Sequence, residues 1–293
     1  MRDSIDKIER IITEDKTGRG IKDLVIYGDM EKAALSLLNS GETVFITTGL
    51  YINDRAVGTD GPSGAIALAT ALHKLGKNAV LVEDGPSKPI IQCALDTVGL
   101  DIPMVLFPIS GREAFAEELI KEYRPSHIIA IERTGPARDG KYYDVKGQAI
   151  AREIGHMDIL FREAGAKGIA TIGIGDEGNE IGMGKIYDQV VRAIPHGEII
   201  ACTIPTDYLV VSGIANWAAH GICACMSLLT CRSLVIKEED ERRLLEELVR
   251  CGAVDAYTKK KEVTVDSLKA EDYFDVVNRL RGIVEEHLRK CQK

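Results

Sequence analysis

Acidic side chains follow several apolar, strand-like runs of this 293-residue sequence. Glu83 and Asp84 follow the run AVLV, Glu132 follows HIIAI, Asp176 follows IATIGI, and the loop after TVFITT leads to Asp60. Carboxylates that pack together raise one another's pKa values unless a cation neutralises them. Because an all-oxygen ligand set suits hard divalent ions, we expect Mg²⁺ or Mn²⁺ at this cluster. The alternative is that these residues only cap strands and begin helices.

Two glycine-rich segments, residues 58–64 (GTDGPSG) and 173–185 (GIGDEGNEIGMGK), have the composition of anion-binding loops. Free backbone N–H groups at the start of a helix attract anions, and glycine allows a ligand to approach closely. Neither segment has the dinucleotide-binding or the Walker spacing. The alternative is an ordinary helix cap, with Asn179 or Glu180 in that role for the second segment. The predicted anion-binding residues are Thr59, Gly61, Ser63, Gly64, Gly175 and Gly178.

Basic residues near these segments are candidates for binding the substrate's anionic groups. Arg133 follows the strand-like run that precedes Glu132, and Lys185 ends the second glycine-rich segment. Arg138 is equally well explained as a solvated surface charge. The histidines have no ligand-like spacing, and no GxSxG motif is present, which argues against a serine hydrolase of that type.

Strand-like and helix-like segments alternate along the chain, and this alternation must position the acidic residues. The expected strands are 43–48, 79–82, 104–107, 127–131, 169–174 and 199–203. The expected helices are 5–13, 29–40, 64–75, 88–98, 112–123, 147–164, 239–251 and 270–290. The pattern predicts an α/β fold, a mainly parallel sheet covered by helices on both faces with extra helices at both termini. Ligands of such sheets bind beyond the carboxyl ends of the strands. No linker interrupts the sequence, so we expect one domain over residues 1–293.

Composition narrows the class of protein. The net charge of −8 argues against a nucleic-acid or anionic-membrane partner. The N-terminus is too charged for a signal or transit peptide, which predicts a cytoplasmic protein. Residues 208–231 carry no charged side chain; we expect a strand in the first four residues and then a buried helix or a homodimer interface. The seven cysteines form no CxxC pair and are expected to be reduced core residues.

Four segments together resemble the C-terminal domain family of D-glutamate cyclases: IERTGPARDGKYYDVKG (131–147), GIGDEGNEIGMGK (173–185), GTDGPSGA (58–65) and TG (48–49). The resemblance covers about residues 25–290. It implies an α/β fold and the family's activity, the reversible loss of water from D-glutamate to give 5-oxo-D-proline. The best-known members carry an additional N-terminal domain related to hydro-lyases, and the resemblance is to a member without it. It also implies an acid-lined site at Glu132, Asp139, Asp176, Asn179 and Glu180.

These observations predict a metal-dependent enzyme that adds or removes water at a small anionic metabolite. The predicted metal ligands are Asp60, Glu132, Asp176 and Glu180, followed by Asp84 and Asp139. The predicted catalytic residues are Glu177 as general base, Arg133, Lys185 and Asn179. Two reactions remain open: ring closure or opening of a glutamate-like substrate, which the resemblance implies, and phosphomonoester hydrolysis, which the two anion-binding loops suggest. A binding module for a nucleotide or amino acid, without chemistry, is the alternative.

Overall fold

The computed structural model describes residues 1–39, 41–49, 51–53, 56–150 and 154–292. Its central sheet has six parallel strands in the order β5-β4-β1-β6-β7-β8. The strands are β1 (Thr43–Thr48), β4 (Asn78–Glu83), β5 (Met104–Leu106), β6 (His127–Ile131), β7 (Ala170–Gly175) and β8 (Tyr208–Val211). A separate antiparallel pair, β2 (Tyr51–Asn53) and β3 (Ala56–Val57), follows β1. The predicted parallel sheet is confirmed.

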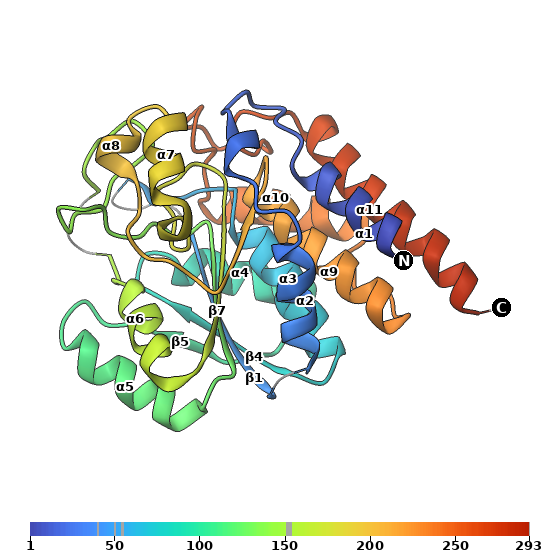
Figure 1. Cartoon of the computed structure of the whole chain (residues 1–293), viewed down its shortest axis with the longest axis horizontal. Helices are drawn as coiled ribbons and strands as arrows, with labels where there is room; N and C mark the ends of the chain where they lie inside the picture. The colour runs from blue at the N-terminus through green and yellow to red at the C-terminus, as the bar shows by residue number, and fades with distance from the viewer. Residues whose placement is uncertain (40, 50, 54–55, 151–153, 293) are drawn as a thin grey trace.

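Helices cover both faces of the sheet (Figure 1). One side holds α1 (Arg2–Ile12), α2 (Asp29–Asn39), α3 (Pro62–Lys74), α4 (Lys88–Val98), α9 (Ala215–Thr230), α10 (Glu238–Cys251) and α11 (Ala270–Cys291). The other side holds α5 (Arg112–Tyr123), α6 (Asp158–Lys167), α7 (Tyr187–Ala193) and α8 (Gly197–Ile200). Alternate strand residues enter the two cores: Val44 and Ile46 join the first, and Phe45 joins the second. Burial of both faces explains why the strands read as continuous apolar runs.

Most predicted elements lie within two residues of the observed ones, but two predictions are wrong. Residues 199–203 are not a strand: they follow or end the short helix α8, and Gly178 and Pro136 accept hydrogen bonds from Cys202 and Thr203. The helix expected over 147–164 begins only at Asp158. Asp144 accepts backbone hydrogen bonds from residues 146 and 148, which forms a turn instead of a helix. Residues 40 and 151–153 of the expected helices lie outside the described residues.

The uncharged run 208–231 forms β8 and the buried helix α9, as expected. Helices α1, α2, α3 and α11 pack around α9, so the chain itself covers this run. The run therefore gives no argument for a homodimer interface. Among the described residues, no helix is both long enough and apolar enough to cross a bilayer.

Two disulfides correct the expectation that all cysteines are reduced. Cys93 in α4 is bonded to Cys251 at the end of α10, and Cys231 is bonded to Cys291 at the end of α11. Cys202, Cys223 and Cys225 are free and buried, as expected. The pairs are 158 and 60 residues apart in the sequence, and only the folded chain brings them together.

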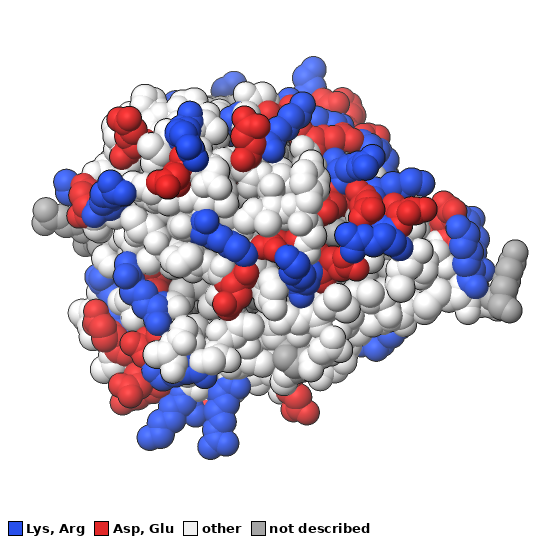
Figure 2. Space-filling view, in the orientation of Figure 1, with Lys and Arg blue, Asp and Glu red and all other residues white. Residues whose placement is uncertain are grey.

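Charged side chains of both signs are mixed over the face of the molecule drawn in Figure 2. Many form pairs one helical turn apart, such as Arg242 with Glu238 and Lys290 with Glu286. Exposed pairs of this kind contribute little to stability, roughly 0.3–0.5 kcal/mol each.

Candidate functional site

A buried acid cluster lies beyond the carboxyl ends of β1, β6 and β7. Asp60 comes from the loop between β3 and α3, Glu132 directly follows β6, and Asp176 directly follows β7. One carboxylate oxygen from each residue lies within 4.8 Å of the other two, and all three side chains are buried. The prediction that carboxylates from distant strand ends meet in one place is confirmed.

Two further carboxylates and one arginine extend this cluster. Asp266, from the segment between α10 and α11, has an oxygen within 4.8 Å of oxygens of Asp176 and Glu177. Arg19, from the segment after α1, contacts Asp176, lies 2.6 Å from Asp266 Oδ2 and 3.6 Å from Glu177 Oε1. Within the described part of the chain, Arg19 pairs with three of the five carboxyl groups, and Asp60 and Glu132 form no ion pair.

The backbone around Glu132 and Gly61 brings their two strand ends unusually close. Glu132 has a φ of +49°, a left-handed conformation that costs energy for a residue with a side chain. Gly61 has a φ of +96°, and a Cβ at this position would lie 2.8 Å from the Cβ of Glu132 and 2.7 Å from Thr48 Oγ1. Only glycine fits here, which places its neighbour Asp60 against Glu132.

The N-terminus of α9 fixes Asp60 in place. The backbone N–H groups of Ala215 and Asn216 each donate to Asp60 at 2.8 Å. The Asn216 side chain in turn accepts from the N–H groups of Gly61 and Gly64 at 3.0 and 2.7 Å. Asp60 therefore stabilises the start of α9, while Asn216 orders the loop that carries Asp60.

Glu180 holds the loop after β7. Its two carboxylate oxygens accept from the backbone N–H groups of Asp176, Glu177 and Gly178 at 2.7, 2.7 and 2.6 Å. The side chain folds over Gly175, where a Cβ would come within 2.7 Å of its Cδ. Glu180 thus shapes the loop that presents Asp176 and Glu177.

Burial raises the pKa values of the cluster carboxyls. The pKa of Asp60 rises to about 7, through burial and then the charge of Asp266. Burial raises the pKa of Glu177 to about 8, against the opposing effect of Arg19. The pKa values of Glu132 and Asp176 are raised well above their usual range, again mainly by burial and also by neighbouring carboxylates. The cluster therefore lacks sufficient positive charge when it contains only Arg19.

Several buried oxygens of the cluster have no hydrogen-bond partner: Glu132 Oε2, Asp176 Oδ1, Glu177 Oε2 and Asp266 Oδ1. Unsatisfied buried carboxylate oxygens are costly, and a cation removes the cost. The set is all oxygen, which is the donor chemistry of Mg²⁺ and Mn²⁺. The residues present therefore fit a divalent cation held by Asp60, Glu132 and Asp176.

Several residues predicted for the site lie elsewhere or have other partners. Asp84 and Arg133 form a buried ion pair with a 2.6 Å contact. Lys185 is 2.6 Å from Asp29 Oδ2, which corrects its expected contact with the substrate. Asp139 and Arg138 are exposed; Asp139 accepts from Tyr143, and the Arg138 guanidinium lies over the Tyr187 ring. These side chains have partners other than Asp60, Glu132 and Asp176, because a position near a strand end does not fix the direction of a side chain.

Several N–H groups of the two predicted anion-binding loops have partners within the protein. The N–H groups of Gly61 and Gly64 donate to Asn216, and those after Gly175, up to Gly178, donate to Glu180. The hydroxyls are also engaged, with Thr59 donating to the Thr264 carbonyl and Ser63 to Glu241. These glycine N–H groups and hydroxyls therefore hold the loops that carry the acidic residues.

Asn179 is buried beside the cluster loop. Its Nδ2 donates to the carbonyl oxygen of Tyr143 at 2.8 Å, while Oδ1 has no hydrogen-bond partner. An unpartnered amide oxygen at this position is available to a ligand's hydrogen-bond donor. Its predicted role as a helix cap is not observed.

Four residues of the site escaped sequence reasoning: Arg19, Asn216, Tyr257 and Asp266. The Tyr257 hydroxyl donates to Glu177 Oε1 at 2.5 Å, and its ring lies under the guanidinium of Arg19. Asn216 lies in the first turn of α9, and the other three come from irregular segments next to helices rather than from strand ends. The one available signal was a buried polar residue, Asn216, at the start of an otherwise apolar helix.

Comparison with known proteins agrees with this geometry. Residues 8–281 match the family described as D-glutamate cyclase-like, C-terminal. A human protein, "D-glutamate cyclase, mitochondrial", is 35% identical over 243 residues, which cover 78% of this chain and 39% of the human protein. The chain thus spans about two fifths of the length of that relative. The acid cluster and both glycine-rich loops lie inside the matched residues, and the chain belongs to the D-glutamate cyclase-like, C-terminal family.

Proposed function

We propose that this protein interconverts a glutamate-like amino acid and its five-membered lactam, with D-glutamate and 5-oxo-D-proline as the first pair to test. The observation that carries the proposal is the acid cluster, in which carboxylate oxygens are buried without partners. Membership of the D-glutamate cyclase-like family supports the choice of reaction, and the name of the human relative supports the choice of substrate.

A divalent cation, Mn²⁺ or Mg²⁺, is the proposed cofactor, with Asp60, Glu132 and Asp176 as its ligands. Such an ion polarises a carboxyl or lactam oxygen and lowers the pKa of a bound water. Arg19 keeps Asp176 and Asp266 together and leaves the remaining oxygens of the cluster available.

Ring closure joins the α-nitrogen of the substrate to its γ-carboxyl carbon, breaks a C–O bond and releases water, and ring opening reverses these changes. The ammonium group must lose a proton before its nitrogen can attack. Glu177 suits this step because its carboxylate lies in the cluster, next to Asp176 and 3.6 Å from the Arg19 guanidinium. Tyr257 holds one oxygen of Glu177, and the other is without a partner and able to take the proton.

Substrate binding needs a hydrogen-bond donor for an anionic group. Arg133 and Lys185, the earlier candidates, are engaged by Asp84 and Asp29. Arg19 is better placed, because its Nε is buried and has no hydrogen-bond partner. We therefore assign Arg19 to the substrate carboxylate.

Phosphomonoester hydrolysis receives less support. That hypothesis depended on two loops with free N–H groups, and the N–H groups of Gly61, Gly64 and Gly178 have partners within the protein. A pure binding module would not need five buried carboxyl groups around one arginine.

The direct test measures 5-oxoproline formed from D-glutamate, and glutamate formed from 5-oxo-D-proline, with EDTA-treated protein before and after addition of Mn²⁺ or Mg²⁺. Activity should depend on the added metal. Asp176→Asn should reduce it at least tenfold, as expected on loss of a metal ligand. The matched control is Asp139→Asn, because this carboxylate is exposed and outside the cluster; activity should change less than about twofold.

Two results would contradict the proposal. One is the absence of either reaction in protein shown to be folded and loaded with metal. The other is release of phosphate from p-nitrophenyl phosphate without formation of 5-oxoproline, which would restore the phosphatase hypothesis.

A further inference from the structure

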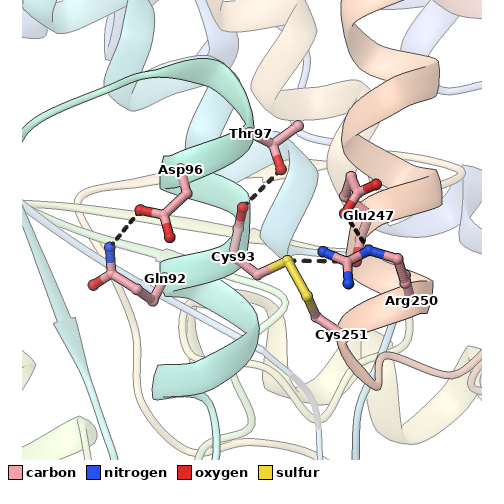
Figure 3. Close-up of a disulfide and its surroundings, with 7 residues drawn as sticks. All are labelled: Gln92, Cys93, Asp96, Thr97, Glu247, Arg250 and Cys251. Atoms are coloured by element: carbon pink, nitrogen blue, oxygen red, sulfur yellow. Dashed lines mark hydrogen bonds and ion pairs between the residues drawn. A yellow bond between two sulfur atoms is a disulfide. The ribbon is translucent and has the colours of Figure 1, made fainter.

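The Cys93–Cys251 disulfide joins two helices at a solvent-accessible groove. It links α4 to the last residue of α10, and both cysteines are partly exposed. The groove has a volume of about 660 Å³, and its lining includes both cysteines and charged residues of both signs: Lys88, Arg243, Arg250, Asp96 and Glu247. Figure 3 shows Glu247 and Arg250 of α10 beside the sulfur atoms. A small thiol therefore has access to this bond, which is what thiol–disulfide exchange requires.

The chain leads from this disulfide directly to the acid cluster. After Cys251 the backbone turns at Gly252, which has a φ of +119°. Val254 then pairs with the loop before α3: its N–H donates to the Val57 carbonyl and its carbonyl accepts from the Thr59 N–H, both at 3.0 Å. Thr59 is the neighbour of Asp60. The disulfide is thus three residues from a backbone contact that supports a cluster residue.

Asp255 then shapes the segment that completes the cluster. Its carboxylate accepts from the N–H groups of Tyr257, Thr258 and Ser267 at 2.8, 2.8 and 2.7 Å, and from the Thr264 hydroxyl at 2.7 Å. This one side chain organises the segment 255–267. The segment places Tyr257 against Glu177 and Asp266 against Arg19.

Asp266 reaches the cluster with a strained backbone. Asp266 and Ser267 have φ values of +50° and +65°, which side-chain-bearing residues rarely adopt. Strain of this kind persists only where the surroundings impose it. The surroundings here are Asp255, which accepts from the Ser267 N–H, and Arg19, which pairs with Asp266.

We propose that Cys93–Cys251 is a reversible thiol–disulfide exchange site whose oxidation state determines whether the 252–268 segment holds Tyr257 and Asp266 at the acid cluster. The oxidised bond fixes the start of this segment. A dithiol reductant breaks the bond: one of its thiolates attacks a cysteine sulfur, the other cysteine leaves as a thiolate and takes a proton, and the second thiol of the reductant resolves the mixed disulfide. The cysteines gain two electrons and two protons, and the reductant becomes a disulfide.

The proposed switch changes how firmly the 252–268 segment is held. Only its effect on metal binding at the acid cluster rests on the proposed function. The second disulfide provides a matched control. Cys231–Cys291 joins the C-terminal ends of α9 and α11, whereas contacts with the cluster come from the N-terminal end of α9 and from the segment before α11. Both crosslinks close long loops, so their removal should lower global stability to a similar extent.

The test uses the full chain with Cys231→Ser/Cys291→Ser, so that Cys93–Cys251 is the only disulfide that the described residues retain. Hydrogen exchange is followed in peptides covering 255–267, with a peptide from β6 as the reference for global opening. Reduction with dithiothreitol should accelerate exchange in 255–267 at least tenfold, leave the β6 peptide nearly unchanged, and be reversed by reoxidation. Cys93→Ser/Cys251→Ser protein should exchange rapidly in 255–267 with or without reductant.

Unchanged exchange in 255–267, or equal acceleration in the β6 peptide, would overturn the proposed switch. The second measurement is the dissociation constant for Mn²⁺, which should increase about tenfold on reduction. If exchange increases but the Mn²⁺ affinity does not change, the link from segment to site is wrong. If the oxidised protein binds no Mn²⁺, the proposed cofactor is wrong, and the exchange data still decide whether the switch exists.

Discussion

Asn216 stabilises the acid cluster without contributing a charge. Its side chain makes three hydrogen bonds to the loop around Asp60, two from the N–H groups of Gly61 and Gly64 and one to the carbonyl of Thr59. All of these groups are buried, so loss of the side chain leaves them without partners.

Asn216→Ala should therefore lower the free energy of unfolding by about 2–4 kcal/mol, since each unsatisfied buried group costs about 1–3 kcal/mol. Urea denaturation measures the loss. The control is Asn278→Ala, which removes one bond from a partly exposed Asn278 to Glu238 and should cost less than about 1 kcal/mol. Equal losses in the two variants would show that Asn216 does not have this role.

At the residue scale, the sequence revealed the carboxylates but not their partners. Asp60, Glu132 and Asp176 could be predicted because the carboxyl ends of parallel strands meet at one edge of a sheet. Arg19 and Asp266 could not, because they arrive on irregular segments whose paths depend on tertiary contacts. Glu180 was assigned to the metal although it holds three backbone N–H groups only two to four residues away. Composition does not distinguish a ligand from a loop-shaping carboxylate.

At the scale of elements, close contact between α3 and α9 sets the position of Asp60. A Cβ at Gly64 would lie 2.9 Å from the Ala219 Cβ and 3.0 Å from the Asn216 Cα. Such distances require the helices to separate, because backbone and Cβ atoms cannot rotate away.

Gly64→Ala should destabilise the protein by about 1–3 kcal/mol, despite the better helix propensity of alanine. Gly165→Ala is the matched control: this glycine lies in α6, and a Cβ there meets nothing within 4 Å. It should raise stability by about 0.5–1 kcal/mol. Thermal and urea unfolding of both variants would show opposite signs, and a stabilising Gly64→Ala would disprove the close contact.

Helices and strands with a regular pattern of hydrophobic residues were predicted well. A segment whose backbone hydrogen-bonds to loops, and not to the sheet, was not. The strand expected over 199–203 has strand-forming residues, but its N–H groups donate to the carbonyls of Gly178, in the second glycine-rich segment, and of Pro136, in the segment after β6. Strand propensity depends on such surroundings. The expectation that all cysteines are reduced was wrong for a related reason: sequence spacing does not reveal which cysteines meet in space.

For the whole molecule, stability at acid pH tests whether the buried His127, at the start of β6, stays unprotonated in the folded protein. His127 is buried, with Ser36 and Ser126 hydroxyls 2.9 and 3.0 Å from its ring nitrogens. Burial, and then the charge of Lys77, lowers the pKa of His127 to about 4. The unfolded chain therefore binds a proton below about pH 6.5 that the folded protein does not, and the free energy of unfolding falls as the pH drops from 6.5 to 4.

His127→Gln removes this titration and retains a side chain able to hydrogen-bond to both serines. Between pH 7 and pH 4, the variant should lose less stability than the original protein, by about 3 kcal/mol at most. Urea denaturation at several pH values measures the difference. Parallel pH profiles for the two proteins would mean that His127 is protonated equally in the folded and unfolded states.

The central claim is that carboxylates from three separated parts of the chain share one divalent cation. Anomalous diffraction from crystals soaked in Mn²⁺ tests it most directly. We predict a strong anomalous peak about 2.0–2.6 Å from oxygens of Asp60, Glu132 and Asp176, and its absence in Asp176→Asn crystals. Peaks only at exposed carboxylates, with none at these three residues, would contradict the account.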